Sequence, residues 1–335
     1  METTPTMNVL ENVPQVPAPA AASANKHARQ VLMTALKFAI SAVLIYFILR
    51  GTSVSEVLTA MASANLFLLF LAAASHIMGF TLSAYRWRLL LRSQGADSSI
   101  MYLIQSYVIS MFFNNFLPST IGGDGVRAYD SWRLGQSKSG AVAVVFVDRF
   151  LGLLVLMLFA SVAALFSPEI MSSDPSLYAW VIVGTLGCVT LTAIIFVPSE
   201  YLPRLVTRLP IPFKEKLLKI LRSFLAFQGK TSVLIRALWL STLLQANVVI
   251  HYFLISEALG LNVPFMSFFL IVPLATFIMM LPISINAIGV REGTFAFFFA
   301  AFGVLHPEAI AFSWIVYGMI VVQGLIGGVL YALRR

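Results

Sequence analysis

Two segments of the chain carry glycine, proline and arginine at matching positions. Residues 117–127 read LPSTIGGDGVR and residues 281–291 read LPISINAIGVR, so Leu, Pro, Ile, Gly, Val and Arg coincide at the same offsets. Glycines let a backbone approach a ligand closely and take positive φ, and a helix that begins after such a break presents its positive end. A guanidinium fork matches phosphate oxygens. The chemistry expected of both segments is therefore the binding of a phosphate.

The residues proposed to bind this phosphate come from both segments. They are Gly122, Gly123, Asp124, Gly125 and Arg127 in the first, and Ser284, Gly289, Arg291 and the adjacent Glu292 in the second. Asp124 is expected to hold the Arg127 fork when the site is empty. The alternative is that these charges form ion pairs at the membrane interface that fix the loop ends, Asp124 with Arg127 and Arg291 with Glu292. Many charged side chains near helix ends simply extend to the water at the interface and bind no ligand.

Two further charged residues, Asp148 and Arg149, stand inside an apolar run over 141–166. An ionisable residue within a membrane costs about 2.5–3.5 kcal/mol on insertion scales. Adjacent positions on a helix do not face each other, so each residue needs its own partner. We expect Arg149 to face a cavity and Asp148 to pair with a cationic residue, and we count both among the residues of the phosphate-binding site. The alternative is that both extend to the cytoplasmic interface from the first turns of the helix.

Arg86 and Arg88 flank Trp87 just after an apolar run over 66–84. Tryptophan and arginine at a helix end are chiefly interface anchors. Their functional interpretation is a gate for a lipid headgroup.

The composition indicates which elements must position these residues. The 335-residue chain is 59% hydrophobic and 11% charged, and its mean hydropathy of +0.89 is not reached by soluble globular domains. The formal charge of +8 comes from basic residues between apolar runs, which indicates topology and lipid contact rather than nucleic-acid binding. One cysteine and four scattered histidines predict neither a disulfide framework nor a metal site, and no cofactor is expected.

The apolar runs predict an all-α polytopic membrane protein with about six full transmembrane helices plus two re-entrant elements. The runs cover 31–49, 66–84, 100–117, 141–166, 177–197, 231–259, 265–281, 288–303 and 309–333. Run 100–117 ends in Asn114-Asn115, followed by Pro118 and a glycine cluster, whereas run 265–281 contains Pro273 and ends at Pro282. Non-helical backbone at membrane depth is tolerated only where protein or a wet cavity covers it, so we interpret both runs as re-entrant.

A single shift along the chain lays 66–84 onto 231–259, 100–117 onto 265–281 and 141–166 onto the last run. With one further helix before each set, each half holds three spanning helices and one re-entrant element, and an odd number of spanning helices turns the second half upside down. Such an inverted repeat is common in transporters, with the binding site where the broken segments meet. The alternative is that glycine and proline merely ease helix packing.

The domain prediction is a disordered cytoplasmic tail over 1–28 and one transmembrane domain over 29–335, with halves at 31–166 and 177–333. The tail is rich in proline and small residues, and such a composition buries too little apolar surface to fold. With the interrupted runs re-entrant, most lysines and arginines fall on one side. We therefore expect a multi-pass protein of the cell (plasma or inner) membrane with both termini cytoplasmic.

Taken together, Arg86-Trp87-Arg88, the two repeated segments and Asp148-Arg149 with Gly152 resemble the lysylphosphatidylglycerol synthase transmembrane-region family. The resemblance runs from about residue 31 to the end of the printed sequence. It implies a flippase domain for aminoacylated phosphatidylglycerol, as a stand-alone member without the soluble synthase domain. Residues 284–287, SINA, depart from the family, which often has more glycine there.

Three functions are open at this point. The leading hypothesis is a non-enzymatic lipid transporter that moves an anionic or aminoacylated phospholipid, or a polyprenyl-phosphate lipid, between leaflets, with membrane lipids as its partners. The second is a membrane partner of a separate lipid-modifying enzyme. The third is a polyprenyl diphosphate phosphatase, which needs several carboxylates converging with a nucleophile or water.

Overall fold

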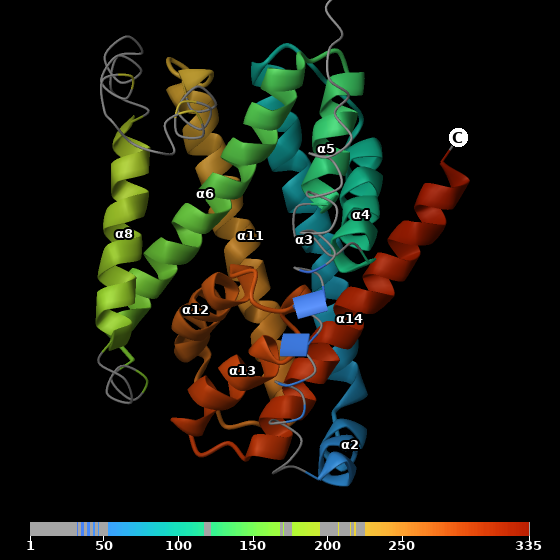
Figure 1. Cartoon of the computed structure of the whole chain (residues 1–335), viewed down its shortest axis with the longest axis vertical. Helices are drawn as coiled ribbons and strands as arrows, with labels where there is room; N and C mark the ends of the chain where they lie inside the picture. The colour runs from blue at the N-terminus through green and yellow to red at the C-terminus, as the bar shows by residue number, and fades with distance from the viewer. Residues whose placement is uncertain are drawn as a thin grey trace, which may run out of the picture.

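The computed structural model describes residues 53–116, 122–167, 176–194 and 225–334, with isolated positions elsewhere. These residues form helices without strands (Figure 1). The α-helices are α2 (Val54–Ala62), α3 (Leu66–Ser93), α4 (Ile100–Phe116), α5 (Gly122–Arg133), α6 (Lys138–Ala164), α8 (Ser176–Ile194), α11 (Thr231–Ala258), α12 (Phe268–Met280), α13 (Val290–Ala300) and α14 (His306–Leu333). Two short 3-10 turns, Phe265–Ser267 and Ile285–Ala287, precede α12 and α13.

Four of these helices, α3, α6, α11 and α14, are long and apolar enough to cross a membrane. A helix of 28 residues, such as α3, is about 42 Å long at 1.5 Å per residue, which exceeds a hydrocarbon core of about 30 Å. The all-α polytopic class is therefore confirmed. The shorter α8 coincides with the predicted run over 177–197, whereas the predicted span over 31–49 and the tail over 1–28 lie outside the continuously described residues.

The order of helices repeats along the chain. A long helix, two short helices and a long helix occur as α3 to α6 and again as α11 to α14. The two short pairs lie toward opposite ends of the molecule, α4 and α5 in its upper part and α12 and α13 in its lower part (Figure 1). This order supports the predicted internal repeat, with each interrupted run continuing into a second short helix.

Helices α3 and α11 lie side by side and antiparallel along their whole length (Figure 1). At one end, Lys230 Nζ donates to the Ser93 carbonyl at 2.6 Å. At the other end, the Asn65 amide donates to the Ala258 carbonyl at 2.7 Å. Because α3 and α11 occupy equivalent places in the two halves, their opposite directions fit an inverted repeat.

Sequence explains where α3 begins and why α12 is short. The Asn65 side chain accepts hydrogen bonds from the amides of Phe67 and Leu68 at 3.0 and 3.2 Å, which satisfies donors that a helix start leaves free. Helix α12 contains Pro273 and ends two residues before Pro282, where a helix cannot retain its regular hydrogen bonds.

The interrupted segments of the two halves meet. The Asn286 amide donates to the Asn115 carbonyl, and the Asn115 amide donates to the Ile320 carbonyl in α14 at 2.8 Å. Asn115 lies at the end of α4 and Asn286 in the turn before α13. The end of α4 in one half is thus bonded to the turn before α13 in the other half.

Candidate functional site

A buried carboxylate on α6 joins two buried arginines from other helices. Asp148 Oδ1 accepts from Arg86 Nε of α3 at 2.6 Å, and Asp148 Oδ2 accepts from Arg127 Nη2 of α5 at 2.6 Å. The exposed fractions are 1% for Asp148 and 5% for each arginine. A buried ion pair is tolerated when its geometry is good and its remaining polar atoms are bonded. The expectation that Asp148 needs a cationic partner is confirmed, and it has two.

Polar and aromatic groups from α4 and α11 complete this cluster. The Tyr107 hydroxyl donates to Asp148 Oδ2 at 2.9 Å, and Arg86 Nη1 donates to Ser241 Oγ at 2.8 Å. The Arg127 guanidinium lies 4.1 Å from the Tyr107 ring centre and 4.8 Å from that of Trp87, which is the range of cation–π attraction. Helices α3, α4, α5, α6 and α11 therefore meet at Asp148. We call Arg86, Tyr107, Arg127 and Asp148 the arginine cluster.

Asp124 and Arg149 form an outer pair beside the arginine cluster. Arg149 Nε lies 2.5 Å from Asp124 Oδ2, whereas Arg127 Nη1 is 3.9 Å from Asp124 Oδ1. Arg149 is the more exposed partner, with 39% of its side chain accessible. The structure thus differs from the expected arrangement: Asp148, rather than Asp124, is the close partner of Arg127, because α6 brings its carboxylate alongside α5.

The glycines at the start of α5 have separate roles. The Gly123 amide donates to Asn114 Oδ1 at 2.8 Å. A methyl group on Gly123 would lie 2.3 Å from the Ser110 carbonyl oxygen, so only glycine fits this contact between α4 and α5. Gly122 begins the helix, and Gly125 faces open space. Gly123 thus permits a close approach between two helices rather than the expected approach to a ligand, and neither Gly123 nor Gly125 has positive φ.

The second repeated segment places its arginine differently. Arg291 Nη2 donates to the Asn286 carbonyl at 2.9 Å, and its guanidinium lies 4.5 Å from the Tyr317 ring centre. Glu292 accepts from the Gly289 amide at 2.7 Å, so it caps α13 and forms no ion pair with Arg291 in the described part of the chain. Arg291 therefore folds back onto the turn that precedes its own helix.

That turn uses the left-handed backbone region at three residues. The φ angles are 51° at Asn286, 58° at Ala287 and 83° at Gly289. Only glycine adopts such values without cost, and asparagine tolerates them better than alanine. Within 284–287, where the family often has more glycine, this chain therefore has Asn286 and Ala287 at positions whose backbone favours glycine.

Several buried hydrogen-bond donors at the two arginines have no acceptor among the described residues. Around the arginine cluster these are Arg127 Nε and Trp87 Nε1. Near the second arginine they are Arg291 Nη1 and the Ser284 hydroxyl. Buried donors are normally satisfied, so each such group calls for an explanation. Both groups of donors match a ligand that only accepts hydrogen bonds, as an ionised phosphate does.

Arg86 and Arg88, expected together as a headgroup gate, are separated by the structure. Arg86 is buried in the arginine cluster, whereas Arg88 lies near the surface and donates to Asp97 at 2.7 Å. Arg92 also bonds Asp97, at 2.8 Å. The hydrogen bonds from Arg88 and then Arg92 hold the pKa of the Asp97 carboxyl below its usual range. Of Arg86 and Arg88, only Arg88 has a partly exposed side chain, with 27% accessible.

A cavity of about 360 Å³ lies between α3, α4, α11 and α14. Tyr107 of the arginine cluster lines it, and so do Tyr252 of α11 and Val316 of α14. Val316 directly precedes Tyr317, whose ring centre lies 4.5 Å from the Arg291 guanidinium. The cavity therefore adjoins the arginine cluster, and its α14 wall is next in sequence to the residue that Arg291 contacts. Its polar lining residues also include Ser75, His76, Gln245, Asn247 and His251.

Sequence reasoning did not assign Tyr107, Ser241 or Asn115 to the site. Tyr107 and Ser241 stand within apolar runs in which a hydroxyl signals little. Asn115 was noted only as a marker of the break in its run. Their roles depend on which helices become neighbours.

The helices, the buried charges and the cavity between the two halves define a polytopic α-helical membrane protein with an internal polar site. Comparison with known families identifies it further. Residues 34–327 match the model of the lysylphosphatidylglycerol synthase TM region. The chain therefore belongs to this family, and the resemblance predicted from its motifs is confirmed.

One curated relative is also similar over nearly its whole length. It is the UPF0104 membrane protein PH1989 of Pyrococcus horikoshii, which is 23% identical over 322 residues. The match covers 88% of this chain and 96% of that protein. The chain therefore resembles a membrane protein of comparable length.

Proposed function

We propose that this protein is a flippase-like transporter that moves a phosphate-bearing lipid between leaflets. The observation that carries the proposal is the pair of buried arginines, Arg127 and Arg291, each with a donor that lacks an acceptor among the described residues. The Arg127 guanidinium lies over Tyr107, which lines a cavity at the junction of two halves that run in opposite directions. The Arg291 guanidinium lies over Tyr317, which is next in sequence to Val316 of that lining. In transporters built from inverted repeats, substrates bind at this kind of junction.

The charge of the first site supports an anionic headgroup. Arg86, Arg127 and Arg149 contribute three positive charges, while Asp124 and Asp148 contribute two negative charges, which leaves +1. An uncompensated buried charge is costly, so an anion that supplies −1 would be bound favourably. One phosphodiester supplies that charge. Asp148 would compete with it for Arg127 and so prevent a site that holds the lipid too tightly.

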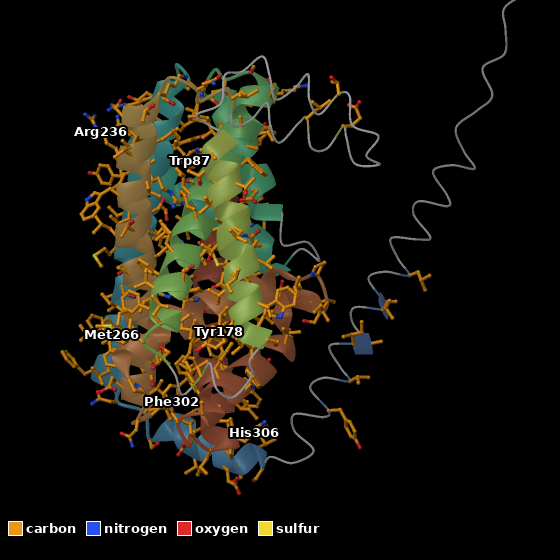
Figure 2. The ribbon with its side chains drawn as sticks, turned by 90° about the vertical axis from the view of Figure 1, so that its left-hand side faces the viewer. Trp87, Tyr178, Arg236, Met266, Phe302 and His306 are labelled. Carbon is orange, nitrogen blue, oxygen red and sulfur yellow. The ribbon has the colours of Figure 1, made fainter. Side chains whose placement is uncertain are left out.

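The transporter is proposed to act in the cell membrane with both termini cytoplasmic, as one domain over 29–335. Arg334 supports this orientation, because it bonds Asp130 of α5 at 2.9 Å and so brings the chain's last helix to the end where α5 lies. Figure 2 places Arg236 at that end and His306 at the other, near α2. An excess of arginine and lysine at one end is typical of the cytoplasmic side.

A phosphatase is less well supported by the geometry. The candidate carboxylates are engaged: Asp148 with two arginines, Asp124 with Arg149, and Glu292 with the Gly289 amide. Hydrolysis would need carboxylates and a nucleophile converging on one diphosphate. Release of phosphate by the purified protein would favour this function instead. Stoichiometric co-purification with a soluble enzyme, without transport, would favour the partner hypothesis.

The test is translocation of fluorescent lipids in proteoliposomes, followed by quenching of the outer leaflet. The panel consists of phosphatidylglycerol, its lysyl ester and a polyprenyl phosphate. Arg127→Lys and Arg291→Lys keep the charge but lose the fork, and a charge-assisted hydrogen bond contributes about 1.5–3 kcal/mol. We expect translocation to slow about tenfold or more in each variant.

The matched control is Arg133→Gln, which changes an exposed arginine on the same helix as Arg127. It should leave the rate unchanged. Equal rates in the wild type and both Lys variants would contradict the proposed roles, and a folded protein that moves none of the lipids would overturn the transport proposal.

A further inference from the structure

Two histidines, one from each half, contact each other in the lining of the cavity. His76 of α3 and His251 of α11 have their Nε2 atoms 3.1 Å apart, and their rings are nearly perpendicular, at 81°. His251 is 4% exposed. Both histidines line the cavity that adjoins the arginine cluster. Ionisable residues inside a membrane bundle are candidates for proton relays.

The hydrogen bonds fix where the protons of this pair lie. His251 Nδ1 lies 2.9 Å from the Ala72 carbonyl oxygen, which can only accept, and 3.2 Å from Ser75 Oγ. The Ser75 hydroxyl already donates to that same carbonyl at 2.7 Å, so His251 Nδ1 carries a proton. In a neutral ring His251 Nε2 is then the acceptor, and His76 Nε2 must be the donor between the rings. His76 Nδ1 is left as the free basic atom of the pair.

A proton added at His76 Nδ1 keeps the whole chain of hydrogen bonds. His76 Nε2–H still donates to His251 Nε2, and His251 Nδ1–H still donates to Ala72. The charged ring thus donates to a neutral acceptor, and charge-assisted hydrogen bonds are stronger than neutral ones. A second proton would place N–H groups opposite each other, so the pair accommodates one proton.

The surroundings do not neutralise that charge. The titratable side chains facing the pair around the cavity are Tyr107 from α4 and Tyr252 from α11, while α14 presents Val316 and Ile320. Farther away, Asp148 of α6 is already bonded to two arginines, and Arg291 of α13 is a cation. No carboxylate lines the cavity among the described residues. A proton on the pair would therefore add to the +1 of the arginine cluster, and an anion inside the cavity lowers the cost of this buried charge by offsetting one of the two.

We propose that the pair of His76 and His251 binds one proton together with the anionic headgroup, so that protons and lipid move through the cavity in one step of transport. This inference rests on the proposed function and adds that transport of the lipid is coupled to transport of a proton. Linkage makes the effect reciprocal: a headgroup that favours the protonated pair is itself bound more tightly as the pH falls.

The experiment measures the affinity of purified protein in detergent for short-chain phosphatidylglycerol, a phosphodiester that keeps its charge between pH 5 and 8. For wild type we expect the affinity to rise by up to about tenfold per pH unit on acidification, the slope for uptake of one proton. His76→Gln can still donate to His251 but cannot take a proton, so its affinity should lose this slope. His306→Gln, at an exposed histidine at the start of α14, should keep it.

His251→Gln is a second variant in case His76→Gln does not fold, and the wild-type slope tests the inference without either. Wild-type binding that is independent of pH, or a slope that persists in a folded His76→Gln protein, would overturn the inference and leave the proposed function standing. Absence of binding at every pH would also overturn it, and the proposed function would fall as well if none of the lipids in the translocation panel moved.

Discussion

Replacing Asp148 by asparagine is the most direct perturbation of the arginine cluster. Asp148 is 1% exposed and balances two guanidiniums, each 2.6 Å away. Asparagine has nearly the same shape but leaves Arg86 and Arg127 buried next to each other without an anion. Removal of one partner from a buried ion pair costs about 3–5 kcal/mol. We expect Asp148→Asn to lower the free energy of unfolding by about this amount.

The measurement is unfolding in mixed micelles, with increasing SDS as the denaturant, in the absence of phosphate-bearing lipid. Asp124→Asn is the matched control, because its close partner Arg149 is 39% exposed. Solvent screens such a pair, and exposed ion pairs contribute about 1 kcal/mol or less. The free energies of unfolding of the two Asp→Asn variants should therefore differ by at least about 2 kcal/mol, with Asp148→Asn the less stable.

Two additions separate an effect of charge from one of packing. Arg86→Gln combined with Asp148→Asn removes one of the two unbalanced cations, so the double variant should be more stable than Asp148→Asn alone. Phosphatidylglycerol should stabilise Asp148→Asn more than the wild type, since the phosphate can replace the missing carboxylate. An Asp148→Asn variant as stable as Asp124→Asn would refute the electrostatic argument, and equal stabilisation by lipid would refute the competition between Asp148 and phosphate.

Two further predictions concern the backbone. Ala287→Gly should raise the free energy of unfolding by about 0.2–1.2 kcal/mol, because the left-handed conformation of Ala287 costs about 1–2 kcal/mol and the lost buried methyl about 0.8 kcal/mol. The same change at the helical, buried Ala275 should lower the free energy of unfolding in the same assay. Gly327→Ala should destabilise it by about 1–3 kcal/mol through overpacking, since the added methyl would lie 2.1 Å from the Val108 carbonyl oxygen. Gly318→Ala, on the same helix but with open space around it, should be neutral or stabilising, and equal effects of the two glycine changes would contradict the close contact.

The sequence predicted the elements well because hydrophobic length and interruption are local properties. The long apolar runs became α3, α6, α11 and α14, and the two interrupted runs became short helices. The need of Asp148 for a cation could also be predicted, because a carboxylate inside an apolar run is costly wherever the helix packs.

The identity of that cation could not be predicted, because it depends on which helices become neighbours. Arg86 was interpreted as a surface residue like Arg88, since the apolar run ends nearby. Helix α3 in fact continues to Ser93, and two residues along a helix lie about 200° apart around its axis. The two arginines therefore lie on opposite sides of one helix, and only Arg86 faces α6. Ser241, which bonds Arg86 from the second half, gave no signal at all.

The contacts between the halves also bear on how a headgroup could pass. Gly324, Gly327 and Gly328 of α14 bring it against α4, where Gly327 lies in direct contact with the Val108 backbone. Helices α3 and α11 are bonded at both of their ends. Sliding one half along the other would break these contacts together, and close-packed interfaces do not deform gradually. In the proposed transport, by contrast, replacement of the Asp148 carboxylate by a phosphate at Arg127 would need only side-chain rotation. The architecture therefore favours a pathway in which side chains at the cavity exchange partners while the helices around it keep their packing.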